Sequence, residues 1–135
     1  MATKTLGRFV LDTTTAQPLA EGQNIPLPVS TVFTNCISCD GSNITINRCG
    51  VYEVSANFTF VATAAGPLET QAYRNGNALP GAHAIDTATT IGNLTSQAFT
   101  AIVTVPKNAP VATINFKVAD ATSVRIANVI VTKVA

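Results

Sequence analysis

Charged residues are scarce in this chain of 135 residues, where Lys, Arg, Asp and Glu together make up 11%. The 8 basic and 7 acidic side chains leave a net charge of +1. Because a nucleic-acid-binding surface needs clustered positive charge to neutralise phosphates, we expect no nucleic-acid partner. Hydrophobic residues make up 47%, which excludes a disordered chain. Length and composition therefore predict one folded domain over residues 1–135.

Long apolar segments are also missing. The most apolar stretches, such as Ala127–Val131, are much shorter than the roughly 20 residues that span a bilayer, so we expect no membrane partner. The start of the chain, Met1–Gly7, has no apolar core of the kind that a secretory signal peptide needs. We therefore expect the protein to fold in the cytoplasm of the cell that makes it.

Residues that carry chemistry are few, because the chain has 3 Cys, 1 His and no Trp. Zinc takes four thiolate or imidazole ligands. The candidate ligands for such a site are Cys36, Cys39, Cys49 and His83. A single Cys-x-x-Cys without a second ligand pair is a weak signal, and small buried thiols around a hairpin explain it better. We therefore predict no metal site and no cofactor.

One histidine also leaves little scope for nucleophilic catalysis. His83 and Asp86 are three residues apart, a spacing that places their side chains on opposite faces of a strand. The acidic residues fall on separate predicted strands or near turns, so no two of them are expected to act as acid and base. We predict that the protein is not an enzyme.

The clearest positive signal is the alternation of apolar and mostly polar residues in Val51–Phe60. Tyr52, Val54, Ala56, Phe58 and Phe60 occupy every second position. A period of two is typical of a strand with one face in a core.

Similar patterns with Gly, Pro and Asn between them predict a series of short strands. These further strands are Leu6–Leu11, Val29–Phe33, Ser42–Ile46, Leu68–Arg74, Leu94–Val105, Val111–Val118 and Val124–Val134. Asn75-Gly76 predicts a tight turn, and Ala78–Gly81 predicts a second turn or a bulged edge. Residues 1–15 form either an N-terminal arm or the first strand, and the pattern favours a strand at Gly7–Leu11. No window has a helical period, so the sequence predicts an all-β sandwich or barrel, with a jelly roll as the eight-stranded option.

The scarcity of charge also bears on assembly. Outward-facing Val, Ala and Ile positions on the last strands exceed what a monomer of this size needs to expose. A homo-oligomer that buries one sheet face against its neighbours explains this composition.

One stretch resembles a known family. Residues Ile44–Ala56 read ITINRCGVYEVSA, which resembles the "strand, then Gly-x-Tyr-x-Val-Ser" entry of C1q/TNF-like jelly rolls. Thr63–Gly66 and the following Arg74–Ala82, RNGNALPGA, are similar to a bacterial and phage branch of that superfamily. That branch includes the C-terminal domains of collagen-like spore-surface proteins and small phage virion proteins. Ala16–Leu27 resembles the lead-in of those phage proteins.

The resemblance implies an all-β jelly-roll sandwich of about eight to ten antiparallel strands that forms a homotrimer. It further implies a structural protein of a phage virion, a cement or head-fibre-like protein that decorates the capsid surface. Its partners would be two further copies of the chain and the major capsid protein or another virion protein. The alternative is a receptor- or glycan-binding tip domain of a phage fibre or bacterial surface protein, with loops such as Gly76–Thr90 making the contacts. A cupin-type enzyme ranks last because the chain lacks the required His cluster.

Overall fold

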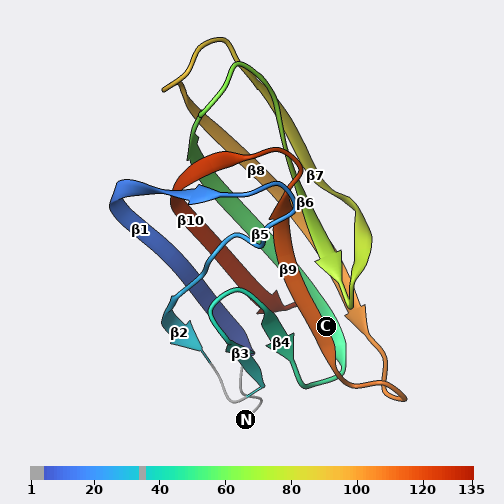
Figure 1. The fold of residues 1–135 in the computed structure, drawn as a ribbon. Coiled ribbons are helices and arrows are strands. Elements are labelled where there is room, and N and C mark those ends of the chain that lie inside the picture. The colour runs from blue at the N-terminus through green and yellow to red at the C-terminus, as the bar shows by residue number, and fades with distance from the viewer. Residues whose placement is uncertain (1–4, 34–35) are drawn as a thin grey trace.

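The computed structural model describes residues 5–33 and 36–135, which form two antiparallel sheets packed face to face (Figure 1). Sheet A contains, in spatial order, β2 (Val29–Phe33), β1 (Leu6–Leu19), β10 (Thr122–Lys133), β5 (Gly50–Val61) and β8 (Leu94–Val105). Sheet B contains, in spatial order, β3 (Ile37–Cys39), β4 (Ile44–Ile46), β9 (Ala112–Val118), β6 (Gly66–Arg74) and β7 (Asn77–Ala88). The predicted all-β sandwich is therefore confirmed. In the described part of the chain, no helix is long and apolar enough to cross a membrane.

Strand β5 is a central strand of sheet A, as its sequence pattern predicts. It pairs along its length with β8 and over most of its length with β10. Its five alternating apolar side chains, from Tyr52 to Phe60, are all buried between the sheets. The polar positions between them point to the other side of sheet A, which is what a period of two requires.

An aromatic cluster joins the two sheets. The Phe58 ring lies 6.0 Å from Phe60, 6.1 Å from Phe99 of β8 and 5.4 Å from Phe116 of β9, measured between ring centroids. The tilted arrangements, with interplanar angles between 33° and 59°, are the offset geometries that aromatic pairs prefer. Phe58 therefore contacts both layers of the sandwich.

Strand β7 corrects one expectation from the sequence. Asn75, with φ of 49°, and Gly76, with φ of 84°, form the predicted tight turn between β6 and β7. The chain then continues as the strand Asn77–Ala88, so most of the range Gly76–Thr90 is strand and not loop. Pro80 and Gly81 lie in a bulge, where the register with β6 shifts between Gln71 and Tyr73.

Gln71 shows why this bulge is stable. Its Nε2 donates to the carbonyl oxygens of Ala72, Leu79 and Ala82, at 2.9, 2.9 and 3.1 Å. A bulge removes residues from the ladder, so their carbonyl groups need other donors. The bulged-edge alternative for Ala78–Gly81 is thus the one that the structure adopts, on an edge strand where proline is tolerated.

Two further strands differ from the sequence prediction. Strand β1 continues to Leu19 and includes Pro18. Its partner β2 pairs with it only at Gly7–Val10, so this part of β1 has one open side and can accept a proline. The short strand β3, Ile37–Cys39, was not predicted; it pairs with β4 through a hairpin turn at Asp40–Asn43.

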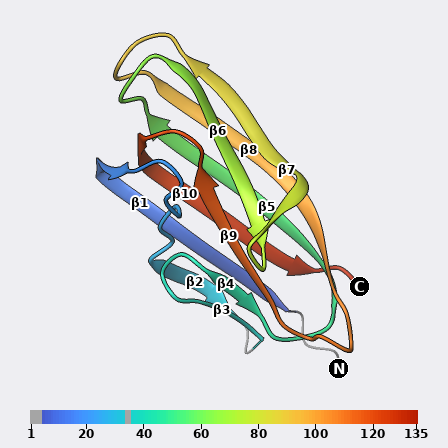
Figure 2. The same ribbon diagram turned by 45° about the vertical axis from the view of Figure 1, so that its right-hand side comes forward.

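The two ends of the sandwich are formed by different segments of the chain. The beginning of β1 pairs with the end of β10, so these two segments lie at one end (Figure 2). The β5–β6 and β7–β8 connections lie at the opposite end, joined by hydrogen bonds between Ala62 and both Gly92 and Asn93.

Replacing Phe58 by Ala will destabilise the fold, because it leaves a cavity between the sheets and removes three ring contacts. We expect a loss of about 3–5 kcal/mol in the free energy of unfolding, measured by urea denaturation. Replacing the exposed Ile91 by Ala is the control and should change stability by less than about 0.5 kcal/mol. Equal stability of both variants would contradict the central place of Phe58 in the core.

Candidate functional site

The outward side of strands β5 and β8 is a sheet surface with two exposed large aliphatic side chains and little charge. The outward positions of β8 are Leu94, Ser96, Ala98, Thr100, Ile102 and Thr104. None of them is charged, and Glu53 is the only charged residue of β5. Leu94 is 61% exposed and Ile102 is 57% exposed. Large aliphatic side chains at this exposure, on a sheet face with little charge, are typical of an interface.

A bulge in β10 extends this surface. The register between β10 and β5 shifts between Val124 and Ile126, so that Arg125 and Ile126 are both exposed. Arg125 turns toward β1, where its Nε donates to the carbonyl oxygen of Thr13 at 3.3 Å. Ile126 pairs with Thr59 of β5. We call the outward side chains of β5 and β8, together with Ile126 and Ile130 of β10, the assembly face.

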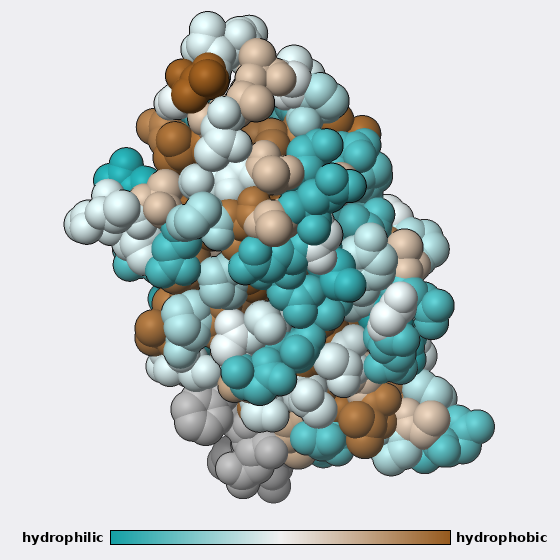
Figure 3. Space-filling view, viewed as in Figure 1, coloured by the Kyte–Doolittle hydropathy of each residue, from teal (hydrophilic) through white to brown (hydrophobic). Residues whose placement is uncertain are grey.

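The outer side of sheet B has a different character. Its outward positions on β6 and β9 include Glu69, Gln71, Tyr73 and Lys117. Figure 3 looks onto this side, where hydrophilic side chains cover most of the middle of the molecule. The β5–β8 part of sheet A therefore has fewer charges than the middle of sheet B, whereas β1 and β10 carry Arg8, Asp12, Arg125 and Lys133.

The residues predicted as candidate metal ligands do not come together. His83 lies on β7 and its Nε2 is 3.6 Å from Oε1 of Glu69 on β6. Cys39 lies on β3, at the opposite edge of sheet B. In residues 5–33 and 36–135, no three His, Cys, Asp or Glu side chains are grouped so that they could hold a metal ion.

The Cys39 thiol has different surroundings from those of Cys36 and Cys49. Cys39 donates from Sγ to the carbonyl oxygen of Leu27 at 3.5 Å, and burial raises the pKa of this thiol. Cys36 and Cys49 lie near the hydroxyl of Tyr52, whose pKa is raised by burial and by Cys36. That hydroxyl donates to the carbonyl oxygen of Arg48 at 2.7 Å, so the Tyr52 side chain binds the segment that precedes β5. Tyr52 is a core residue, as predicted.

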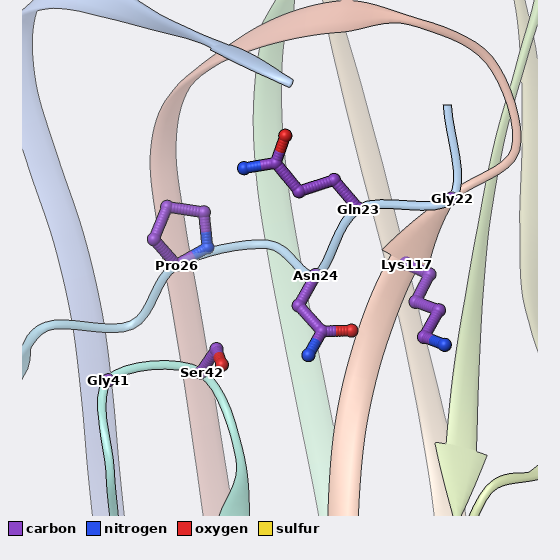
Figure 4. Close-up of a pocket in the computed structure, with 7 residues that line it drawn as sticks. All are labelled: Gly22, Gln23, Asn24, Pro26, Gly41, Ser42 and Lys117. Atoms are coloured by element: carbon purple, nitrogen blue, oxygen red, sulfur yellow. The ribbon is translucent and has the colours of Figure 1, made fainter. Parts of the chain in front are cut away.

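A polar hollow of about 560 Å³ lies on the outer side of sheet B (Figure 4). Its lining residues are Gly22, Gln23, Asn24, Pro26, Gly41, Ser42 and Lys117. The sequence did not point to this hollow, because its residues come from three separate segments. The one local sequence feature in this region is Asp40-Gly41, a dipeptide typical of a tight turn.

The turn that forms one wall of the hollow is held by Asp40. The Asp40 carboxylate accepts hydrogen bonds from the backbone N–H of Asn43 at 2.8 Å, from the Asn43 side chain at 3.2 Å and from the backbone N–H of Ser42 at 3.2 Å. These bonds to the charged form lower the pKa of Asp40 below its usual value.

Comparison with solved structures shows which known fold this chain resembles. The Eiger TNF structure from S. frugiperda superposes with a TM-score of 0.73, at 12% identity, covering 99% of this chain and 94% of that one. Murine APRIL at pH 5.0 superposes with a TM-score of 0.72, at 9% identity, covering 98% of this chain and all of the other. The chain is a TNF-like jelly roll.

Another solved structure with a similar fold is a vertex protein. PRD1 vertex protein P5 superposes with a TM-score of 0.58, at 9% identity, and the match covers the whole of both chains. At these identities the likeness concerns the fold alone. No protein-family model matches the sequence, and no curated protein matches it either. The resemblance to C1q/TNF-like jelly rolls that the sequence suggests is thus confirmed for the TNF-like fold.

Replacing Asp40 by Ala will lower the melting temperature at pH 7, because the turn loses the acceptor of three hydrogen bonds. A carboxylate with a lowered pKa stabilises the fold above its unfolded pKa of about 3.9, and this contribution is lost as the pH falls through the folded pKa. The difference from the wild type should therefore shrink as the pH falls below about 4. Asp120→Ala in the β9–β10 turn is the control, because the structure gives that carboxylate no hydrogen bond. A difference for Asp40→Ala that persists at low pH would contradict this account.

Proposed function

We propose that this TNF-like jelly roll is a structural protein of a phage virion, which forms a homotrimer and decorates the capsid surface. The observation that carries the proposal is the assembly face, a sheet surface with little charge on which the exposed Leu94, Ile102 and Ile126 lie. The TNF-like fold supports a trimer, since proteins of this fold are usually trimeric. The likeness to the vertex protein of the phage PRD1 supports a place on a virus particle.

The assembly face has the features of a buried interface. Ile102, Leu94 and Ile126 are aliphatic anchors, and the small side chains of Ser96, Ala98 and others between them allow a second backbone to approach closely. An interface of standard size buries about 800 Å² on each partner, and its affinity depends on well-packed anchors such as these more than on area. In a three-fold ring the contacts are heterologous, so the assembly face of each copy packs against a different surface of its neighbour.

The proposed role is mechanical and non-enzymatic. A trimer bound to the capsid would bridge neighbouring capsid subunits and resist the outward pressure of the packaged genome. Such a protein needs a rigid fold, two surfaces that pack against its neighbours in the trimer and a further surface for the capsid.

Replacing Ile102 by Lys will dissociate the trimer, because three unpaired ammonium groups would be buried in the interface. We expect a dissociation constant raised at least about 100-fold, which corresponds to about 2.7 kcal/mol. The molar mass is measured by light scattering during size-exclusion chromatography. The wild type should elute near three times the chain mass of 14.0 kDa, and the variant near the chain mass itself.

Ile85 provides a matched control. It is 60% exposed, close to the 57% of Ile102, but it lies on β7 of sheet B. Ile85→Lys should remain trimeric. A monomeric wild type, or an Ile102→Lys variant that stays trimeric, would contradict the assembly face as the trimer contact.

The place on the particle is tested by gold-labelled antibodies against this protein on intact phage particles in electron micrographs. Label spread over the capsid shell supports the decoration role. Label confined to the tips of fibres would instead favour the receptor- or glycan-binding tip, and particles without any label would refute a virion component.

A further inference from the structure

The turn between β6 and β7 contains a chemically reactive dipeptide, Asn75-Gly76. A glycine after an asparagine leaves the backbone nitrogen unhindered, so this nitrogen can attack the side-chain amide carbon of the asparagine. Both residues are exposed, and a Cβ atom on Gly76 would have no neighbour within 4 Å. Neither burial nor crowding therefore protects this dipeptide from the reaction.

The reaction exchanges the side-chain amide for water. The Gly76 nitrogen forms a bond to Cγ of Asn75, the bond from Cγ to Nδ2 breaks, and the proton of the Gly76 nitrogen leaves with Nδ2 as ammonia. The resulting five-membered succinimide takes up one water molecule, which opens the ring at either carbonyl group. Opening at one carbonyl gives aspartate. Opening at the other gives isoaspartate, which adds one carbon atom to the backbone.

The conformation of the turn opposes ring closure. The φ angles of 49° at Asn75 and 84° at Gly76 are both positive, and Arg74 pairs directly with Asn77, so this is a two-residue type I′ turn. The ring contains the Cα–C bond of Asn75, so Cβ and the Gly76 nitrogen must be nearly eclipsed about this bond. In a type I′ turn these two atoms are roughly 150° apart about the bond. The ring can therefore form only after the turn has opened.

Two hydrogen bonds to β9 hold the turn closed. The Thr113 N–H donates to Oδ1 of Asn75 at 2.8 Å, and the Asn75 N–H donates to the Thr113 carbonyl oxygen at 2.9 Å. Thr113 is the residue next to Ile114, where the pairing of β6 with β9 ends. The Asn75 side chain thus supplies an acceptor that the strand ladder no longer provides. Opening of the turn breaks both bonds.

We propose that Asn75 is a modification site that the fold keeps closed, and that its amide is lost only in molecules whose β6–β7 turn has detached from β9. The Thr113 N–H controls the rate, because the turn must release its bond to Oδ1 before the ring can form. An isoaspartate lengthens the backbone between Arg74 and Asn77, so the two-residue turn no longer fits. The turn belongs to sheet B and lies outside the assembly face, so this inference does not rest on the capsid role.

Asp40-Gly41 shows the same kind of protection, and an aspartate before glycine can form the same ring. The Asp40 carboxylate is held by the backbone N–H groups of Ser42 and Asn43. The Gly41 carbonyl oxygen accepts from the Leu27 N–H at 2.6 Å. Both reactive dipeptides of the chain are therefore fixed through their side chains. Asn75 is the better site to test, because its reaction releases ammonia and changes the mass of the chain.

The test follows amide loss at Asn75 in the full-length protein during incubation in mildly alkaline buffer, which favours removal of the Gly76 proton. Samples are kept with and without concentrated urea and then digested. Liquid chromatography with mass spectrometry separates the amide, aspartate and isoaspartate forms of the peptide that contains Asn75. We expect conversion in the folded protein to be at least about tenfold slower than in urea, because only locally opened molecules react.

The exposed turn before β9 offers a matched control. Ala109→Gly creates a second Asn-Gly dipeptide at Asn108, whose side chain has no hydrogen bond within residues 5–33 and 36–135. Both dipeptides then lie in the same folded molecule and the same buffer. Asn108 should lose its amide at least about tenfold faster than Asn75, because its turn opens without breaking a side-chain bond.

A pair of variants isolates the bond from β9. Thr113→Pro removes the N–H that binds Oδ1 of Asn75 and keeps the carbonyl oxygen of residue 113. Conversion of Asn75 should become about fivefold faster, the factor expected for the loss of one hydrogen bond. Thr113→Val keeps both backbone groups and should react like the wild type. Circular dichroism and urea denaturation show whether each variant is folded.

Three results would overturn the proposal. The first is conversion of Asn75 that is as fast in the folded protein as in urea. The second is an Asn108 in the Ala109→Gly variant that stays as intact as Asn75, because the bonds to β9 would then be unnecessary for protection. The third is a folded Thr113→Pro variant that reacts at the wild-type rate. If Thr113→Pro does not fold, the comparison within the Ala109→Gly variant decides.

Discussion

The packing of β5 between β10 and β8 is the constraint on which the rest of the structure depends. Its inward side chains fill the space between the sheets, with Phe58 in contact with both layers. A slip of one residue would turn this whole set toward the outside, so the core fixes the register of β5 against both neighbours. The same register places Ile102 opposite Glu53 and Leu94 opposite Val61. The composition of the assembly face is thus set by the pairing that builds the core.

Departures from regular pairing create the surfaces that the sheets alone would not have. The bulge of β10 exposes Ile126 beside β5 and sends Arg125 toward β1, which moves a charge away from the assembly face. On sheet B, the change of partner along β9 opens the polar hollow. Each departure is accompanied by hydrogen bonds that satisfy the freed backbone groups, as Gln71 does in the bulge of β7.

How much of this the sequence predicts depends on how local the signal is. The alternation in Val51–Phe60 and the dipeptide Asn75-Gly76 are local, and both predictions are confirmed. Strand β7 was missed over most of its length because Pro80-Gly81 interrupts the pattern, and the group that makes the bulge tolerable is Gln71 of another strand. The hollow depends on contacts between distant segments, such as Asn24 with Asn115, which no single window contains.

The scarcity of charged residues limits how the outer sides of the two sheets can be covered. A chain with 11% charged residues cannot cover both sheets with ionised side chains. On sheet A its few charges lie mainly on β1 and β10, at Arg8, Asp12, Arg125 and Lys133, while β8 carries none. Exposed aliphatic side chains such as Ile102 leave apolar area in water in a monomer, and this cost disappears when another copy covers them. Assembly through sheet A would leave the outer side of sheet B, with Lys117 and the hollow, as the surface that faces other molecules.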